Sequence, residues 1–453
     1  MMEPYELTAT QALSSIRSGA LTVEQYARSL LQRISTRDDV VKAWAYLDPE
    51  YVIREAKRLD AVPVTERGPL HGLPVAVKDI IYTRDMPTQF NSPIYKDNAP
   101  NVDAACVMVL RQAGALILGK TTTTEFASAS GTSPTTNPHS SLRTPGGSSS
   151  GSAASVADFQ CALSIGSQTG GSIIRPASFN GIYGYKPTWG AISREGLKLY
   201  SYTYDTIGFF SRSVSDLELI ADVYNLEKKD ADDKDRKFSL QGARFAVVRQ
   251  PSSASSLAGL ATWAALHGAM KLLRKHGAFV DEEITLPPDF DKMPKWYDDL
   301  LKSEARATFL PEYLVAKDKL SAFLVGQVEN TVSRAEQVEA MDRLAALRPV
   351  LDGILTGKRE GKGGGYDAII TPSTLGEAPL GLESTGSPAY NSMWTALHTP
   401  VVNVPGFDGV NNMPVGVSLV GPRFHDRRLL AVAEAVGKVF EEEGMWKLKV
   451  HGV

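Results

Sequence analysis

The chain has 453 residues, of which 43% are hydrophobic and 22% charged, a composition typical of folded globular proteins. Its 48 basic and 51 acidic residues give a net charge of −3, so no overall field favours nucleic acid or an anionic membrane as partner. No apolar run has the length of a bilayer span, and we expect no signal peptide at the N-terminus. The 2 cysteines cannot build a disulfide framework, so we expect a reduced, cytoplasmic setting.

The N-terminal part, residues 1–62, predicts helices. Apolar residues recur there at helical spacing, and Thr8 and Thr22 stand where helix N-caps are expected. From residue 74 the apolar runs become short and continuous, as in buried strands. The elements expected next are strands over residues 75–77 and 115–118, with a helix over residues 104–113 between them.

Residues 125–190 are dominated by Gly, Ser and Thr. Apolar clusters at 153–157 and 161–165 make this stretch too apolar for a flexible linker. Glycine-rich sequence inside a folded region indicates backbone packed tightly against other backbone or against a ligand.

The second half of the chain alternates between strand and helix patterns. A charged run over residues 225–237 predicts a solvated connection, and residues 361–365 a loop. Strands are expected over residues 244–248, 367–371, 401–404 and 415–420, and helices over about 257–353 and over 426–442. The alternation predicts an α/β fold, with a single α/β/α layered domain and a large mixed, mostly buried sheet.

We expect that one domain to cover residues 1–453 and to have four parts, because the strands after residue 365 must join the same sheet as those before 225. The parts are N-terminal helices over 1–62, a core over 63–225, a mainly helical insertion over 253–365, and returning strands with a final helix over 366–442.

The usual catalytic motifs give only weak signals. None of the 7 histidines falls in a metal-binding spacing, so we expect no metal and no cofactor. Residues 147–151 match the nucleophile-elbow pattern G-x-S-x-G with Ser149 as nucleophile, but any loop rich in Gly and Ser satisfies it by chance. No Gly-Lys-Ser/Thr follows that loop, which disfavours a phosphate-binding loop.

Lys78 ends the apolar run 71–77 and offers another kind of base. Burial disfavours the charged form of an amine, so a buried lysine has a lowered pKa and is available as a neutral base near pH 7. A lysine on a solvated face is the alternative, and the position alone does not decide between the two.

Several long motifs, in order along the chain, resemble those of the amidase signature family. They cover most of the chain from about residue 70 to 437, with residues 226–365 the least similar. The main motifs are Gly72-Leu-Pro-Val-Ala-Val-Lys78-Asp79, Pro145-Gly-Gly-Ser-Ser-Ser-Gly-Ser-Ala-Ala154, Gln168-Thr-Gly-Gly-Ser172-Ile-Ile-Arg-Pro-Ala177, Gly181-Ile-Tyr-Gly-Tyr-Lys-Pro-Thr188, Tyr366-Asp-Ala-Ile-Ile-Thr-Pro372 and Pro414-Val-Gly-Val-Ser-Leu-Val-Gly-Pro422.

The resemblance implies a Ser-Ser-Lys relay, in which Ser172 is the acyl nucleophile, Ser148 the bridging serine and Lys78 the base. In the family, the bridging serine follows a cis non-proline peptide bond. The implied oxyanion hole consists of backbone N–H groups, and the loop after residue 125 supplies part of the acyl pocket. These further site residues are Thr169, Gly170, Gly171 and Ser172 for the oxyanion, and Phe126 and Ser128 for the pocket.

Two positions depart from the family pattern. Members commonly have Asp four residues before the nucleophile and Arg two residues after it, whereas this chain has Gln168 and Ile174, with Arg175 one step later. We interpret this as the loss of both halves of an ion pair, which avoids leaving a buried charge without a partner.

The resemblance implies an amide-bond hydrolase that forms an acyl-enzyme and releases a carboxylate and an amine or ammonia. Ester and carbamate hydrolysis are also expected. Two alternatives stay open: an amidotransferase A-type subunit of a glutamine-dependent complex, and a homologue that binds ligand without catalysis. We expect a small-molecule amide or ester as substrate, no nucleic acid, no membrane span, and a monomer or homodimer.

Overall fold

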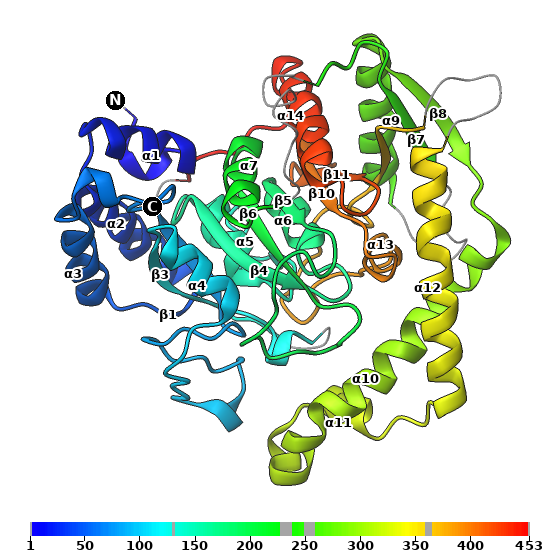
Figure 1. Cartoon of the computed structure of the whole chain (residues 1–453), viewed down its shortest axis with the longest axis horizontal. Coiled ribbons are helices and arrows are strands. Elements are labelled where there is room, and N and C mark those ends of the chain that lie inside the picture. The colour runs from blue at the N-terminus through cyan, green and yellow to red at the C-terminus, as the bar shows by residue number, and fades with distance from the viewer. Residues whose placement is uncertain (1, 129–131, 227–237, 249–258, 358–364, 452–453) are drawn as a thin grey trace.

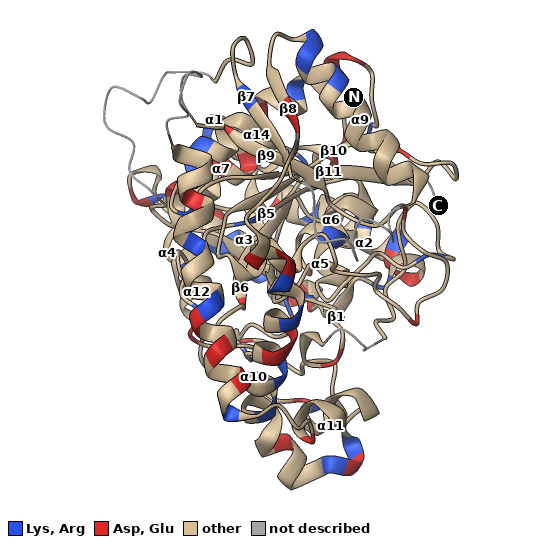
Figure 2. Cartoon of the chain, turned by 90° about the vertical axis from the view of Figure 1, so that its right-hand side faces the viewer, with Lys and Arg blue, Asp and Glu red and all other residues tan. Residues whose placement is uncertain are grey.

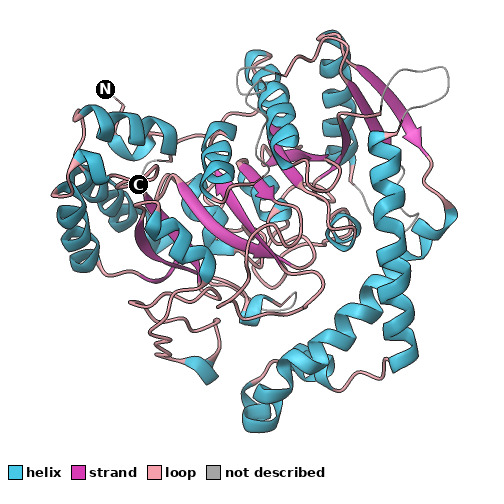
Figure 3. Ribbon diagram, viewed as in Figure 1, coloured by secondary structure: helices cyan, strands magenta, loops and turns pink. Residues whose placement is uncertain are grey.

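A computed structural model describes residues 2–128, 132–226, 238–248, 259–357 and 365–451. Its centre is an 11-stranded sheet with the strand order β1-β3-β2-β4-β6-β5-β10-β11-β9-β7-β8 (Figures 1 and 3). The strands are β1 (Trp44–Tyr46), β2 (Pro74–Lys78), β3 (Leu116–Thr121), β4 (Leu163–Gln168), β5 (Tyr183–Lys186), β6 (Thr206–Ser211), β7 (Arg244–Val248), β8 (Phe279–Ile284), β9 (Ala368–Pro372), β10 (Val401–Asp408) and β11 (Pro414–Val420).

The sheet is mixed. β2 runs parallel to both β3 and β4, and β7 runs parallel to both β8 and β9, while the strands between these groups pair antiparallel. Every residue of β2, β3, β4 and β6 is buried, which accounts for their continuous apolar or small-residue sequences. The prediction of an α/β fold with a large mixed sheet is confirmed.

Helices pack on the sheet in two groups. One group, α5 and α6, lies against β2–β6, β10 and β11; the other, α7, α9 and α14, lies against β6 and β8–β11. The helices are α1 (Ala9–Ser18), α2 (Val23–Val41), α3 (Pro49–Asp60), α4 (Ala105–Gln112), α5 (Ser150–Ala157), α6 (Ile174–Asn180), α7 (Val214–Val223), α9 (Leu260–Lys275), α10 (Met293–Ala316), α11 (Ala322–Val328), α12 (Arg334–Thr356), α13 (Ser392–Ala396) and α14 (Asp426–Glu442).

The predicted helix starts at the N-terminus are confirmed. Thr8 and Thr22 are the N-caps of α1 and α2, and each threonine hydroxyl accepts a hydrogen bond from the backbone N–H three residues later. Within the described residues, no helix is both long and apolar enough to cross a membrane.

The strands near the C-terminus join the same sheet as those of the first half. Val401 of β10 pairs with Lys186 of β5, and β11 then pairs with both β10 and β9. Residues far apart in the sequence therefore meet at the centre of the sheet. How the chain divides into domains stays a prediction.

Two strands lie where the sequence analysis predicted helix. β1 falls within residues 1–62 and has only three residues, too few to give a repeating pattern. β8 falls within the stretch expected to be helical, and its charged centre, Asp281-Glu-Glu283, hides the strand pattern. The charged run over 227–237, the start of the helical stretch at 257–258 and most of the loop over 361–365 lie outside the described residues.

Beyond the sheet, α10, α11 and α12 form an arm that extends at the lower right of Figure 1. In Figure 2 basic and acidic residues alternate along α10 and α12. Several are paired one turn apart, such as Lys302 with Asp298 at 2.6 Å and Lys295 with Asp299 at 2.6 Å. The arm thus has a solvated outer surface of mixed charge.

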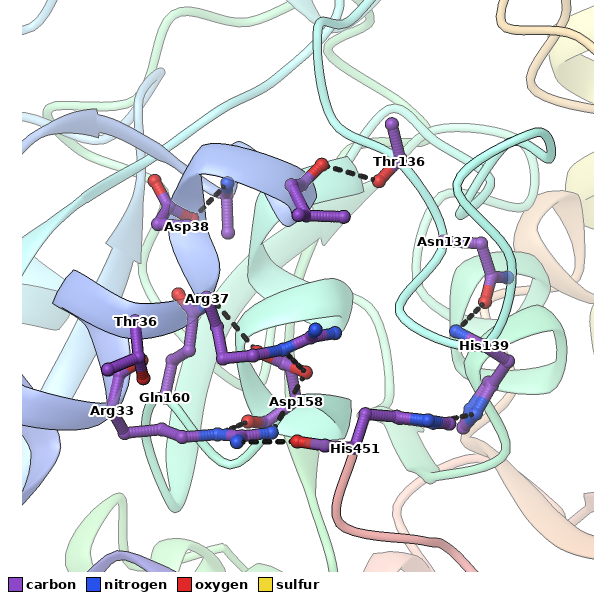
Figure 4. A network of polar contacts seen from close by, with 12 residues as sticks. Arg33, Thr36, Arg37, Asp38, Thr136, Asn137, His139, Asp158, Gln160 and His451 are labelled. Atoms are coloured by element: carbon purple, nitrogen blue, oxygen red, sulfur yellow. Dashed lines mark hydrogen bonds and ion pairs between the residues drawn. The ribbon is translucent and has the colours of Figure 1, made fainter. Parts of the chain in front are cut away.

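A buried polar network ties α2 to the residue that follows α5 (Figure 4). Asp158 is fully buried, and its carboxylate accepts hydrogen bonds from Arg33 and Arg37 of α2, each at 3.1 Å. Arg33 also donates to the carbonyl of His451, whose ring contacts His139 at 2.9 Å. The network therefore joins the N-terminal helices, the C-terminal segment and the helix that begins beside Ser148.

Candidate active site

Lys78 is the last residue of β2, and Gln168 is the last residue of the parallel strand β4. The carboxyl ends of parallel strands meet at one edge of a sheet, so residues at and just after these ends lie close together. The Lys78 Nζ atom is fully buried and donates hydrogen bonds to Ser148 Oγ at 2.8 Å and to Ser167 Oγ at 3.0 Å.

The environment of Lys78 favours its neutral form. Burial lowers the pKa of Lys78 well below the ordinary value for lysine, while Asp205 raises it and Arg175 lowers it further. An amine held in this way can accept a proton at a pH where an exposed lysine is charged. The solvated alternative for this lysine is thus wrong.

Ser148 and Ser149 are neighbours with different surroundings. The Gly147–Ser148 peptide bond is cis, as the family resemblance implied. Ser148 Oγ faces Lys78 Nζ, whereas Ser149 Oγ is fully buried and donates to the carbonyl of Ser167 at 3.1 Å. The geometry places Ser148, and not the serine of the elbow pattern, against the buried amine.

Ser172 follows a tight loop at the end of β4 and is 8% exposed. Its hydroxyl makes no hydrogen bond with any described residue. The backbone N–H groups of Gly170, Gly171 and Ser172 likewise have no acceptor in the described part of the chain. Successive unpaired N–H groups beside a hydroxyl provide donors that can stabilise a developing oxyanion.

The loop that carries Ser172 is held from both sides. Gln168 Oε1 accepts hydrogen bonds from the N–H groups of Ile173 and Ile174, at 2.8 and 3.1 Å. Gln168 Nε2 donates to Thr395 Oγ1 at 3.0 Å, and Thr395 donates to the carbonyl of Gly170 at 2.8 Å. These bonds fix the backbone from which the free N–H groups project.

A second set of contacts fixes Thr169. Its hydroxyl donates to Asp205 Oδ1 at 2.5 Å, and the hydroxyl of Tyr297 donates to the Thr169 carbonyl at 3.1 Å. Burial raises the pKa of Asp205 to about 6, opposed by the Thr169 hydroxyl and two backbone N–H donors. The hydroxyl of Tyr297, a residue of α10, thus contacts the loop.

Both loop glycines lie in tight surroundings. A Cβ atom at Gly170 would lie 3.1 Å from the Tyr297 hydroxyl oxygen, and one at Gly171 would lie 3.0 Å from Asn391 Nδ2. A side chain at either position would displace these contacts, so the Gly-Gly pair allows the loop to pack against α10 and the segment before α13.

Comparisons with known proteins identify the family of the chain. Residues 25–430 match the family described as Amidase. The chain belongs to the amidase family. It is 32% identical to the A-type subunit of the glutamyl-tRNA(Gln) amidotransferase of Acidothermus cellulolyticus, over 98% of this chain and 96% of the relative.

Solved structures of the amidase family show the same fold. One described as a crystal structure of amidase is 28% identical, covers 97% of this chain and 100% of its own, and has a TM-score of 0.81. The peptide amidase from Stenotrophomonas maltophilia is 26% identical, covers 97% and 98%, and has a TM-score of 0.77. The prediction of an amide-bond hydrolase is confirmed.

Phe126 and Ser128, the predicted pocket residues of this amidase, are both buried. Phe126 lies between aromatic rings, stacked on Phe90 with centroids 5.8 Å apart and tilted against Phe309 at 5.8 Å. The Ser128 hydroxyl is buried and has no hydrogen-bond partner among the described residues. The surroundings of Phe126 are those of a core side chain, whereas the Ser128 hydroxyl keeps its donor and acceptor free.

Our interpretation of the two departures from the amidase pattern requires correction. Gln168 holds the loop through neutral hydrogen bonds, as described, and does not need a charged partner. Arg175, however, is 3% exposed and forms no ion pair with any described Asp or Glu. The expectation that no buried charge is left unpaired is therefore wrong, because Arg175 lies buried beside the loop without an acidic partner among the described residues.

Three functional neighbours were not predicted as site residues. Asp205 begins the run Asp205-Thr-Ile-Gly208, which resembles a further amidase signature motif, so a signal was present in the sequence. Ser167 and Thr395 carry no such signal, because their roles depend on contacts with Lys78 and Gln168 that only the fold creates.

Proposed function

We propose that the chain hydrolyses a linear amide by a Ser-Ser-Lys relay in which Ser172 is the nucleophile, Ser148 the bridging serine and Lys78 the base. One observation carries the proposal: the fully buried Lys78 Nζ lies 2.8 Å from Ser148 Oγ. A serine hydroxyl is a poor nucleophile until a base removes its proton, and the buried neutral amine supplies that base.

In the first half-reaction Ser172 Oγ attacks the amide carbon and forms the C–O bond. Its proton passes to Ser148, whose own proton passes to Lys78. The C–N bond then breaks, and the leaving amine takes a proton from Ser148, which recovers one from Lys78. Water repeats the same transfers on the acyl-enzyme, and the products are a carboxylate and an amine or ammonia.

The unpaired N–H groups of the loop support an oxyanion hole made from Thr169, Gly170, Gly171 and Ser172. Loss of one such donor typically raises the barrier by about 3–4 kcal/mol. Ser172 is not hydrogen-bonded to Ser148 in the free protein, and catalytic hydrogen bonds of this kind often tighten only when substrate binds. We assign the free Ser128 hydroxyl to the acyl side of the pocket, with Phe126 behind it.

A fluorophosphonate probe followed by intact-mass spectrometry and peptide mapping tests the relay. We expect one label on Ser172, no label in Ser172→Ala, and a faint label in Lys78→Ala. Ser149→Ala is the matched control and should label normally. A label on Ser149, or full labelling of Ser172→Ala, would overturn the assignment in favour of the elbow pattern.

The proposed substrate is a small molecule, and esters and carbamates should also react because the relay protonates whichever group leaves. We further propose that the protein acts in the cytoplasm, since Cys106 and Cys161 are free and buried. We also propose that it acts as a monomer or homodimer.

The similarity to the A-type subunits of amidotransferases, 32% identical over 98% of this chain, favours a second candidate function. In that case the same relay would release ammonia from glutamine for a partner complex. Purified protein assayed with glutamine and with a panel of simple amides separates the two. Turnover of simple amides without partners supports the stand-alone enzyme, whereas glutamine turnover that requires added partners supports the amidotransferase role.

A further inference from the structure

The proposed mechanism leaves one charged group beside the reacting atoms without a role. The guanidinium of Arg175, in the first turn of α6, is buried and donates from Nη2 to the carbonyl of Gly147 at 2.6 Å and to the Thr385 hydroxyl at 3.1 Å. Gly147 immediately precedes Ser148, so this cation lies against the loop of the bridging serine.

The same cation also reaches the loop of the nucleophile. A Cβ atom at Gly171 would lie 3.1 Å from Arg175 Nη1, and Gly171 immediately precedes Ser172. Since consecutive Cα atoms are about 3.8 Å apart, the guanidinium lies within a few ångströms of the backbone that carries the nucleophile. Arg175 is therefore positioned between the two serine-bearing loops.

Two donors of this guanidinium, Nε and Nη1, have no hydrogen-bond partner among the described residues. Burial lowers the pKa of Arg175 to about 10, so the group still carries its charge at neutral pH. A buried cation without a counter-ion is strongly unfavourable unless a ligand supplies the missing charge and acceptors. Other buried arginines here have such a partner: Arg33 and Arg37 share Asp158.

We propose that Arg175 binds a carboxylate of the substrate, placed only a few bonds from the amide that is cleaved. This inference rests on the proposed function and adds the substrate class to it. Guanidinium is the side chain best suited to carboxylate recognition, because its planar donors stay charged and match carboxylate oxygens. The proximity of Arg175 to both serine loops limits the chain between the carboxylate and the scissile carbonyl to a short one.

Matched substrates that differ only in charge test the proposal on the wild-type protein. One pair is the half-amide of an unbranched three- to five-carbon dicarboxylic acid against the neutral diamide of the same acid. A second pair is an N-acyl glycine, with its free carboxylate, against the corresponding N-acyl glycinamide. Preference for the anion in the first pair places the carboxylate on the acyl side, and in the second pair on the amine side. Equal kcat/KM within both pairs overturns the proposal.

Arg175→Met removes the charge and keeps a side chain of similar reach. We expect kcat/KM for the preferred anionic substrate to fall about 10- to 100-fold, mainly through KM, because a charge-assisted contact is lost. Because Arg175 also donates to the Gly147 carbonyl and lowers the pKa of Lys78, kcat/KM for the neutral partner should fall as well, but less than for the anionic substrate when both are measured at plateau pH. If Arg175 only held the Gly147 loop, the substitution would lower kcat/KM equally for both substrates. That result would contradict the proposal.

Arg343→Met is the matched control, since it removes the same charge from an exposed site on α12 and should leave the anion preference intact. If Arg175→Met fails to fold, Arg175→Lys keeps the charge and should retain part of the preference.

Succinate should also slow fluorophosphonate labelling of the wild-type protein more than succinamide does. Absence of any label on Ser172 would refute the proposed function, whereas normal labelling without charge preference would refute only the role of Arg175.

Discussion

The edge of the sheet around Lys78 and the arm of α10–α12 use charged and polar residues in opposite ways. At the sheet edge the polar side chains are almost fully buried, and several are held by buried hydrogen bonds; Gln168 alone makes three. Along the arm, ion pairs such as Lys302–Asp298 have side chains 39% and 53% exposed. Buried polar contacts are costly to disrupt, whereas exposed ion pairs contribute little.

Lys78→Arg should have the largest effect in the molecule. Guanidinium cannot act as a base at neutral pH, so we expect the amide kcat to fall about 10⁴-fold, leaving only catalysis by positioning and the oxyanion hole. In the wild type, kcat/KM should fall on the acid side as Lys78 becomes protonated. Because the pKa of Lys78 is lowered, that fall should begin well below the ordinary range for lysine. Steady-state kinetics across pH checks both points, and near-normal turnover by Lys78→Arg would exclude the base role.

Ser148→Ala should have the second-largest effect on activity, and the size of that effect should depend on the leaving group. An amine must be protonated as it departs, whereas an activated phenolate need not be, so amide turnover should fall about 10²- to 10⁴-fold and activated-ester turnover much less. Parallel assays with one acyl group as anilide and as nitrophenyl ester measure the difference. Equal losses of turnover for the anilide and the ester would show that Ser148 has only a structural role and transfers no proton.

Asp158→Ala tests a buried charge away from the chemistry. It leaves Arg33 and Arg37 without their shared acid, and removal of one partner from a buried ion pair typically costs about 3–5 kcal/mol. We expect that loss in the free energy of unfolding by urea, with fluorophosphonate labelling of Ser172 retained at low temperature. A change below about 1 kcal/mol, the range of surface pairs, would show that the network is not a stabilising one.

Two substitutions should move the acid limb of the pH profile in opposite directions. Asp205 raises the pKa of Lys78, so Asp205→Asn should shift the limb to lower pH; Arg175 lowers that pKa, so Arg175→Met should shift it to higher pH. The plateau activity of Asp205→Asn should stay within about tenfold of wild type, since the hydrogen bonds to Thr169 and to two backbone N–H groups lose their charge but can still form. Shifts of the same sign in both variants would contradict the electrostatic description of Lys78.

The smallest effect is expected on the arm. Lys302→Ala removes an ion pair one helical turn from Asp298, and such pairs contribute about 0.3–0.5 kcal/mol. Urea unfolding should detect a change of that size or none, and amide kinetics should not change. A loss comparable to that of Asp158→Ala would mean that the arm is coupled to the sheet far more tightly than its exposure indicates.

Sequence patterns predicted the bounds of helices and strands best where the apolar pattern of an element is regular. The strand over 244–248 and the helix over 426–442 occur with the predicted bounds, because their apolar patterns are regular. β8 was missed since Phe279, the first residue of an edge strand, is 63% exposed and charged residues follow it. A strand of this kind has no continuous apolar face to reveal it.

Within the candidate site, the resemblance to the amidase signature motifs predicted Lys78 and Ser148, which the fold brings together at 2.8 Å. The sequence did not show that Arg175 would bond to Gly147 and to Thr385, because Thr385 lies 210 residues away along the chain. Motif comparison identifies which residue types are present. Whether a buried charge has a partner depends on long-range packing, which one sequence does not specify.

The pairing of β5 with β10 has a consequence for synthesis on the ribosome. Until residue 401 emerges, one side of β5, residues 183–186, has no strand to pair with. At about 5–20 residues per second, roughly 10–40 s separate the appearance of the two strands. During that time the nascent first half exposes an open hydrophobic sheet edge, which is a template for aggregation. Yield in a heterologous host should therefore depend on chaperones that bind the growing chain, and faster translation of residues 187–400 should raise it.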